Sequence, residues 1–234
     1  NLLYHGCVPL NEDGSFQEVE IYGKKFSGKA LYDEIEVYAR KGYYAVDPIE
    51  KKKGQDILWF IWENKHSPVF GKAKMTTFER YFVEDPVTHQ EPKNPYYRLL
   101  EREDVVNAIL AEFGLCGEEC HIINGHIPVE AKAGESPVKC GGKLLIIDGG
   151  FSRAYQPKTG IAGYTLIYNS YGLEKAVMEG TDIHSDTILV QHVNRRKTVA
   201  DTDNGKAIAE TIRDLQDLLD AYRAGLIVED FGKA

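Results

Sequence analysis

The sequence predicts an α/β protein. Residues 27–42 carry apolar side chains at helical spacing, and a second apolar stripe at helical spacing runs through residues 208–222. From residue 121 onward, short apolar runs alternate with Gly, Pro, Asn and Asp, as in strands separated by turns. Helices and short strands combined in a chain of 234 residues indicate an α/β fold with a sizeable core.

The first third of the chain predicts one strand, one helix and one ambiguous apolar run. Residues 2–4 form an apolar segment that we interpret as the end of a buried strand. Ser27 is expected to cap the following helix, and Gly42 to close it. Residues 57–62 are apolar throughout, which fits a buried strand or a short core helix, and periodicity does not decide between them.

The middle of the chain predicts a loop, a short helix and then strands. Three prolines indicate a loop over residues 85–97, and residues 101–113 predict a short helix that Gly114 ends. The strand candidates that follow are residues 122–123, 143–147, 164–168 and 188–193.

The C-terminal segment predicts the clearest helix of the chain. Its apolar residues form one stripe, and Gly225 stands where a helix C-cap is expected. The stripe consists of Ile208, Ile212, Leu215, Leu219 and Tyr222. We expect this helix to pack its stripe on the core and to leave its charged face in solvent.

Charge and cysteine content narrow the class of partner. The 28 basic and 36 acidic residues give a net charge of −8, which argues against a general nucleic-acid binder because phosphates require a basic field. No apolar run approaches the roughly 20 residues of a membrane span. Four cysteines are few for this length, so we expect a reducing cytoplasm. From the net charge and the short apolar runs, we expect neither nucleic acid nor membrane as a partner.

Two histidines occur in similar surroundings. His5 and His126 each stand beside a glycine where an apolar strand candidate ends. A metal ligand needs a neutral imidazole held by a rigid element, and an adjacent glycine lets the backbone turn sharply there. The alternative is a pair of histidines that are hydrogen-bonded in the core. A third strand candidate ends in Asp148-Gly149-Gly150, which suits anion binding by backbone N–H groups or, equally, a plain turn.

The segment from Asn124-Gly125-His126 to Asp148-Gly149-Gly150 resembles the distal part of calcineurin-like metallophosphoesterases. Within that superfamily the chain is most similar to the class III fructose-1,6-bisphosphatases of bacteria, and the resemblance extends along nearly its whole length. The matching segments are residues 3–11, 74–82, 134–137, 146–155, 159–172 and 201–203.

The resemblance implies a fold and a domain organisation. Residues 1–9 and 116–200 would form the C-terminal part of a two-sheet metallophosphoesterase sandwich of αββα type. Residues 10–115 would be an insertion of helices and loops, and residues 201–234 a C-terminal helix packing on the core.

The resemblance also implies a reaction, a cofactor and ligands. The reaction is hydrolysis of the 1-phosphate of fructose 1,6-bisphosphate, a gluconeogenic step, at a dinuclear divalent-metal centre, with Mn²⁺ as the expected ion. His5 and His126 would ligate the same ion. The superfamily's usual second histidine after His126 is replaced by Pro128, so the other ion must depend on other ligands.

Three upstream ligand motifs of the superfamily are absent from the sequence: Asp-x-His, Gly-Asp-x-x-Asp and Gly-Asn-His followed by an acid. We therefore expect the chain to be a C-terminal portion of a longer phosphatase. Two imidazoles without a shared carboxylate do not build a dinuclear site, so the isolated chain should be a poor phosphatase or an inactive one.

A bisphosphate substrate also needs cations for the phosphate that is not cleaved. The candidates are Lys132, Arg153, Arg195 and Arg196, and the alternative for each is a solvent-exposed charge. A zinc site at Cys116, Cys120 and His121 is disfavoured, because the cysteine spacing is not the usual Cys-x-x-Cys.

The expected partners are a phosphorylated sugar and either a second copy of the chain or the missing N-terminal part. Two rival functions stay open. One is a related metallophosphatase that acts on phosphoproteins or nucleotides. The other is a non-catalytic fragment that serves folding or assembly.

Overall fold

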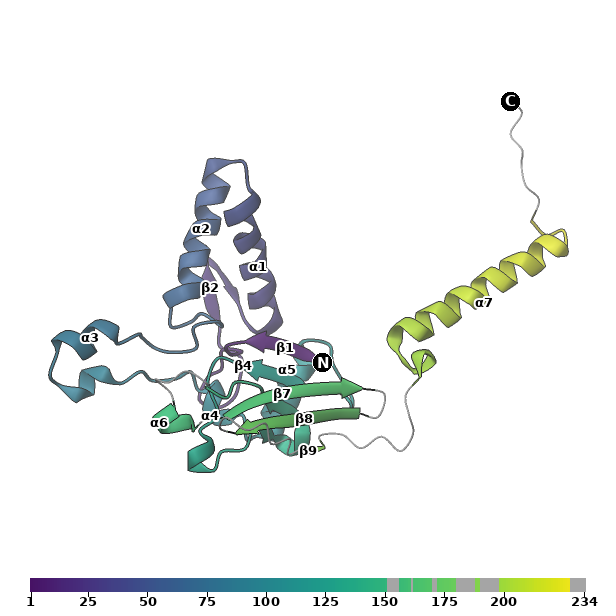
Figure 1. Cartoon of the computed structure of the whole chain (residues 1–234). Coiled ribbons are helices and arrows are strands. Elements are labelled where there is room, and N and C mark those ends of the chain that lie inside the picture. The colour runs from purple at the N-terminus through teal and green to yellow at the C-terminus, as the bar shows by residue number, and fades with distance from the viewer. Residues whose placement is uncertain (151–155, 161, 170–171, 180–187, 190–197, 228–234) are drawn as a thin grey trace.

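The computed structural model of the chain describes residues 1–150, 156–160, 162–169, 172–179, 188–189 and 198–227 (Figure 1). The strands are β1 (Leu2–His5), β2 (Val19–Ile21), β3 (Lys24–Phe26), β4 (Ile122–Gly125), β5 (Val138–Lys139), β6 (Leu144–Ile146), β7 (Ala162–Asn169), β8 (Gly172–Glu179) and β9 (Ile188–Leu189). The α-helices are α1 (Gly28–Tyr44), α2 (Pro48–Glu63), α3 (Thr77–Phe82), α4 (Tyr96–Leu99), α5 (Glu103–Glu112), α6 (Gln156–Thr159) and α7 (Asp203–Arg223). The 3-10 helices are η1 (Pro86–His89), η2 (Ala131–Ala133), η3 (Cys140–Gly142) and η4 (Val199–Asp201). The α/β class is confirmed.

The central sheet is mixed and has the strand order β1-β4-β6-β5. β1, β4 and β6 are parallel, and β5 is antiparallel to β6. The carboxyl ends of the three parallel strands therefore lie at one edge of the sheet. β1 lies at one edge of this sheet and β5 at the other, and Leu3 of β1 is 67% exposed, so the expectation of a buried strand here was wrong. Successive side chains of a strand point to opposite faces of the sheet, and one face of β1 is more covered than the other, which explains its alternating burial.

The main core surrounds this sheet. It joins residues of β4 and β6 to α4 and α5, and Tyr96, Val106, Ile109, Ile122 and Leu144 are among its fully buried members. Much of this core thus comes from residues between β1 and β4. β7, β8 and β9 form a separate antiparallel sheet in that order, and Tyr164 of β7 packs against the same core. The boundaries of the predicted insertion stay a prediction.

A helical hairpin and a small ribbon form a second cluster. α1 and α2 lie antiparallel beside the β2-β3 pair, and Leu31, Ile35 and Ile57 are buried there (Figure 1). Gly42 does not close the first helix. Gly42 lies inside α1 and faces Gly54 of α2. A Cβ added to Gly54 would come within 2.0 Å of the backbone nitrogen of Gly42. The two glycines let the helix backbones approach closely.

The ambiguous apolar run at residues 57–62 is helical because local signals favour a helix. Asp47 caps α2, and its side chain accepts hydrogen bonds from the N–H groups of Ile49 and Glu50 at 2.9 Å. Pro48 occupies the first turn, where proline is tolerated. Once started, the helix buries Ile57 against α1.

Two further expectations met different outcomes. The helix expected over residues 101–113 is present as α5, and Gly114 follows it at φ +74°. The proline-rich stretch expected to be a loop contains η1 and the first residues of α4. Pro86 stands at the start of η1, and Pro95 caps α4, positions where the missing N–H of proline costs nothing.

The C-terminal helix is confirmed, but it is not packed on the core. α7 starts at the Thr202 cap, and Gly225 follows its end at φ +71°. Its stripe residues are 41–60% exposed, and among the described elements α7 packs chiefly against η4 (Figure 1). No helix in the described ranges is long and apolar enough to cross a membrane.

The contact between Gly42 and Gly54 yields a first prediction. Replacement of a helical glycine by alanine ordinarily stabilises a helix by about 1 kcal/mol. Gly54→Ala should instead destabilise the chain by about 1–3 kcal/mol, because its methyl group would push α1 away from α2. Urea unfolding measures the difference. Gln55→Ala, at the exposed next position, is the control, and a stabilised Gly54→Ala would show that the helices do not meet here.

Candidate metal centre

The centre lies where β1 and β4 end side by side. The parallel register pairs Tyr4 with Asn124 and His5 with Gly125, so His5 and His126 leave the sheet at the same edge. The buried amide of Asn124 donates to the carbonyls of Tyr4 at 3.2 Å and Gly6 at 3.0 Å. This side chain therefore ties the turn after β1 to β4.

The structure brings the two predicted histidines together. His5 Nε2 lies 2.9 Å from His126 Nδ1, and the ring planes are inclined at 76°. His126 has φ +95°, a conformation that non-glycine residues rarely adopt. Such strain persists where the surrounding structure imposes it, and it is commonest at functional sites.

The hydrogen bonds determine which nitrogen of His126 carries the proton. Its Nε2 lies 3.0 Å from the Phe70 carbonyl, and because a carbonyl only accepts, Nε2–H is the donor. Burial lowers the pKa of His126, and the nearby His5 lowers it further, so the ring is neutral near pH 7. Nδ1 therefore keeps its lone pair, and this lone pair faces His5.

The Phe70 carbonyl is held by a loop that the sequence interpretation missed. The hydroxyl of Ser67 donates to the Ile61 carbonyl at 2.7 Å and accepts from the N–H groups of Val69 and Phe70. The Pro68 carbonyl accepts from the Cys7 N–H at 2.7 Å, two residues after His5. The available signal was Ser67-Pro68, a turn-forming pair, but nothing in the sequence indicated its target.

The two imidazoles fit a shared divalent ion. His5 Nε2 and His126 Nδ1 lie at the distance of a hydrogen bond, 2.9 Å. Two nitrogens bound at right angles to one ion, at about 2.1 Å each, would lie about 3.0 Å apart, so the same pair of atoms can accept an ion with little movement. Asp148 follows β6 at the same edge and exerts an electrostatic effect on His126. In the part of the chain that the structure describes, no three His, Cys, Asp or Glu side chains gather to hold a metal.

Of the basic residues predicted to bind the substrate phosphate, only one lies in the part of the chain that the structure describes. Lys132 lies on η2, is exposed, and donates to the Gln156 carbonyl at 3.1 Å. Arg153, Arg195 and Arg196 lie outside the described residues. In the disfavoured zinc motif, His121 is buried, and its Nδ1 donates to the Gly142 carbonyl at 2.8 Å.

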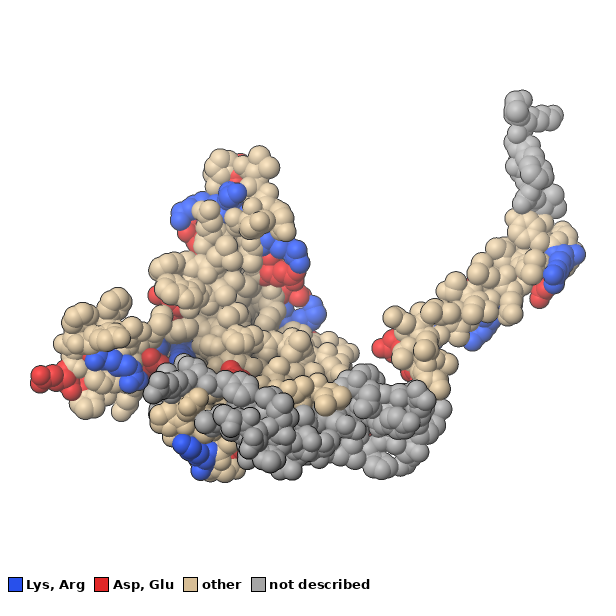
Figure 2. Space-filling model, in the orientation of Figure 1, with Lys and Arg blue, Asp and Glu red and all other residues tan. Residues whose placement is uncertain are grey.

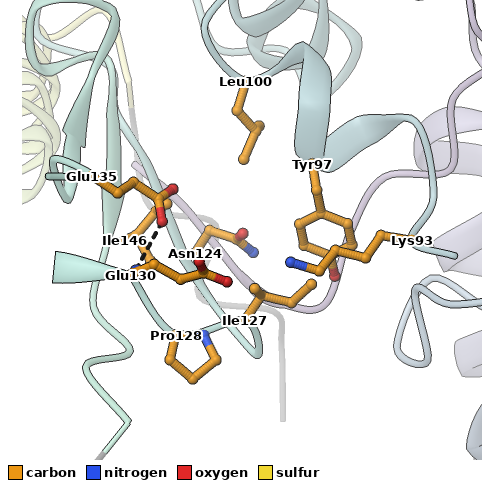
Figure 3. A pocket seen from close by; sticks show the side chains of 9 residues that line it. All are labelled: Lys93, Tyr97, Leu100, Asn124, Ile127, Pro128, Glu130, Glu135 and Ile146. Atoms are coloured by element: carbon orange, nitrogen blue, oxygen red, sulfur yellow. Dashed lines mark hydrogen bonds between the residues drawn. The ribbon is translucent and has the colours of Figure 1, made fainter. Parts of the chain in front are cut away.

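A small pocket adjoins the centre (Figure 3). Asn124, Ile127 and Pro128 line one side of it, and the side chains of Lys93 and Tyr97 project toward them (Figure 3). Its volume is about 60 Å³, which suits a few water molecules and is far too small for a sugar bisphosphate.

Residues 71–94 form an extension that contains α3 and η1, called here the excursion. One carboxylate near Phe70 joins the beginning of the excursion to its end. Glu91 accepts from Lys72 Nζ at 2.9 Å and from the Thr76 N–H at 3.0 Å and hydroxyl at 2.9 Å. Burial alone would raise the pKa of Glu91, but these partners lower it to about 2. The charged carboxylate therefore stabilises the base of the excursion.

Glu91→Gln should lower the free energy of unfolding by about 1–2 kcal/mol at pH 7. The depressed pKa means that the contribution of Glu91 is fully present above its ordinary value of 4.5 and is lost as pH falls toward about 2. The difference from wild type should thus shrink below pH 4.5 in urea titrations. Glu84→Gln, at an exposed site on the same excursion, is the control, and a difference that does not vary with pH would contradict the assignment.

The protonation of His126 gives a third prediction. In the metal-free protein, long-range ¹H–¹⁵N correlation spectra should show His126 as the Nε2–H tautomer at neutral pH, because the Phe70 carbonyl needs a donor. Ser67→Ala should weaken this preference by loosening the loop. An Nδ1–H tautomer in the wild-type protein would contradict the geometry.

Comparison with known proteins adds an independent finding. The family model described as Firmicute fructose-1,6-bisphosphatase matches residues 1–224. The chain is 54% identical over 242 residues to a fructose-1,6-bisphosphatase class 3 of Clostridium botulinum (strain Loch Maree / Type A3). It is also 54% identical over 241 residues to that of Clostridium acetobutylicum (strain ATCC 824).

Both alignments cover 98% of this chain and 36% of the relative's length. The chain thus spans about a third of the curated relatives that it matches. No solved structure matches it.

Proposed function

Because the chain belongs to the Firmicute fructose-1,6-bisphosphatase family, we propose that the whole protein hydrolyses the 1-phosphate of fructose 1,6-bisphosphate and that this chain supplies two imidazole ligands of its metal centre. The observation that supports this most directly is the 2.9 Å separation of His5 Nε2 and His126 Nδ1 at the shared edge of β1 and β4. The names of the relatives supply the substrate, fructose 1,6-bisphosphate, and removal of its 1-phosphate is what the family resemblance implies.

The proposed cofactor is a divalent ion, with Mn²⁺ as the expected one. Such an ion would supply positive charge for phosphoryl oxygens and lower the pKa of a bound water. The residues of this chain fix the ligand geometry. The Phe70 carbonyl keeps the proton on Nε2 of His126, which leaves Nδ1 for the ion, and Asn124 holds the turn that carries His5. A backbone carbonyl as partner of a ligating histidine is a common arrangement.

The proposal extends to the fold. A two-sheet metallophosphoesterase sandwich is supported by the packing of Tyr164 of the β7-β8-β9 sheet against the core of the central sheet. β1 offers an edge for further strands of the whole protein, with Leu3 exposed beside it. We propose that the remaining ligands and the bridging carboxylate come from the rest of the protein, where the superfamily's upstream ligand motifs would lie; among the described residues, no third His, Cys, Asp or Glu joins the pair.

Lys132 and the three arginines stay candidates for the phosphate that is not cleaved. Lys132 is the one whose position is described, and its ammonium is exposed on η2. Its Cγ would lie 3.5 Å from a Cβ placed at Gly160, in the glycine-rich segment that follows Asp148. An exposed cation beside a glycine-rich turn suits a phosphate, and this supports Lys132 for that role.

The test uses a protein that spans the full length of the relatives. His5→Asn and His126→Asn should each lower kcat for fructose 1,6-bisphosphate by at least about 100-fold with Mn²⁺ present, because each removes an ion ligand. His89→Asn, on the excursion away from the centre, is the control. Near-normal turnover in both ligand variants would contradict the proposal.

The 234-residue chain alone should show no turnover above background. Turnover by this chain, abolished by His126→Asn, would keep the histidine roles and overturn the expectation that other ligands are needed.

A further inference from the structure

The C-terminal helix α7 carries an apolar stripe whose spacing is that of a helix-to-helix seam. Its residues follow one another at intervals of four, three, four and three positions. This is the heptad pattern, with a period of 3.5 residues, in which each side chain inserts between side chains of a facing helix. The residues in order are Ile208, Ile212, Leu215, Leu219 and Tyr222.

The chain shows elsewhere how it covers such a stripe. Leu31, Ile35 and Tyr38 of α1 have the same spacing, and they pack in a cluster with Ile57 of α2. The stripe of α7 is equally apolar, but its side chains are 41–60% exposed. α7 is a complete helix nonetheless. The Thr202 hydroxyl accepts from the Gly205 N–H at 3.0 Å, and η4 packs on its first turn.

We propose that α7 is a self-association helix and that a second copy of α7 covers its stripe. Charge supports a second copy over a charged partner. At the positions that flank a heptad seam, the middle of the helix carries Ala209, Thr211, Gln216 and Leu218. The charged side chains of this stretch lie on the opposite side, and Figure 2 shows a broad uncharged face along α7. Two identical helices therefore meet without like-charge repulsion.

The area also suits a pair of copies. The five stripe residues and Leu218 are 41–60% exposed. If each presents on the order of 100 Å² to solvent, two helices together would cover roughly 1,000 Å², the lower bound for a specific interface. The stripe runs from Ile208 to Tyr222, about two heptads, which forms a short coiled coil, so the association should be reversible and dependent on concentration. This inference does not depend on the proposed function.

The test measures the mass of the full 234-residue chain over a range of concentrations by sedimentation velocity. Wild type should shift from monomer to dimer with rising concentration. Leu215→Lys, at the centre of the stripe, should raise the dissociation constant at least about 10-fold. Asp217→Lys introduces the same side chain two residues away, on the charged face, and should dimerise at least as well as wild type.

Three results would overturn the proposal. One is a monomer at every concentration, and another is a dimer that Leu215→Lys leaves intact. The third is a lower melting temperature of Leu215→Lys in dilute, monomeric samples, with Asp217→Lys unchanged, because the stripe would then be packing on its own core.

Discussion

The parallel pairing of β1 with β4 brings together two short segments that are more than a hundred residues apart, and the candidate centre depends on it. Parallel strands end at the same edge, so residues at equivalent positions beyond their ends become neighbours. His5 and His126 meet in this way, and the register decides which residues meet. A shift of one strand by one position would turn its histidine to the opposite face of the sheet from the other histidine. Asn124 helps to fix that register, because its buried amide bonds to two carbonyls of the β1 segment.

The chain between these strands also shapes the centre. The turn at Ser67 sends the Phe70 carbonyl to His126, and the Pro68 carbonyl accepts from the Cys7 N–H beside His5. The segment that separates the histidines in sequence therefore orients one of them. The group that contacts His126 is a backbone carbonyl, which every residue carries, so this contact leaves little trace in the sequence.

Much of the fold could be predicted from the sequence, and the misses have physical causes. The spacing of apolar residues in α5 and α7, with a glycine after each, was sufficient to predict both helices and their ends. The prediction that Gly42 ends the first helix was wrong, because in the sequence a glycine that lets two helices approach looks like one that ends a helix. His5 and His126 were identified from the glycines beside them and from family resemblance. Their contact, the role of Phe70 and the pocket at Lys93 and Tyr97 depend on long-range pairing, which local patterns do not encode.

In the proposed centre, one ion binds to Nδ1 of His126 and Nε2 of His5. Nitrogen NMR of the full-length protein loaded with cadmium-113 tests it most directly, because scalar coupling identifies each ligand atom. One cadmium signal should couple to both of these nitrogens, while Nε2 of His126 keeps its proton for the Phe70 carbonyl. Coupling through Nε2 of His126, or coupling of the two histidines to different ions, would contradict it.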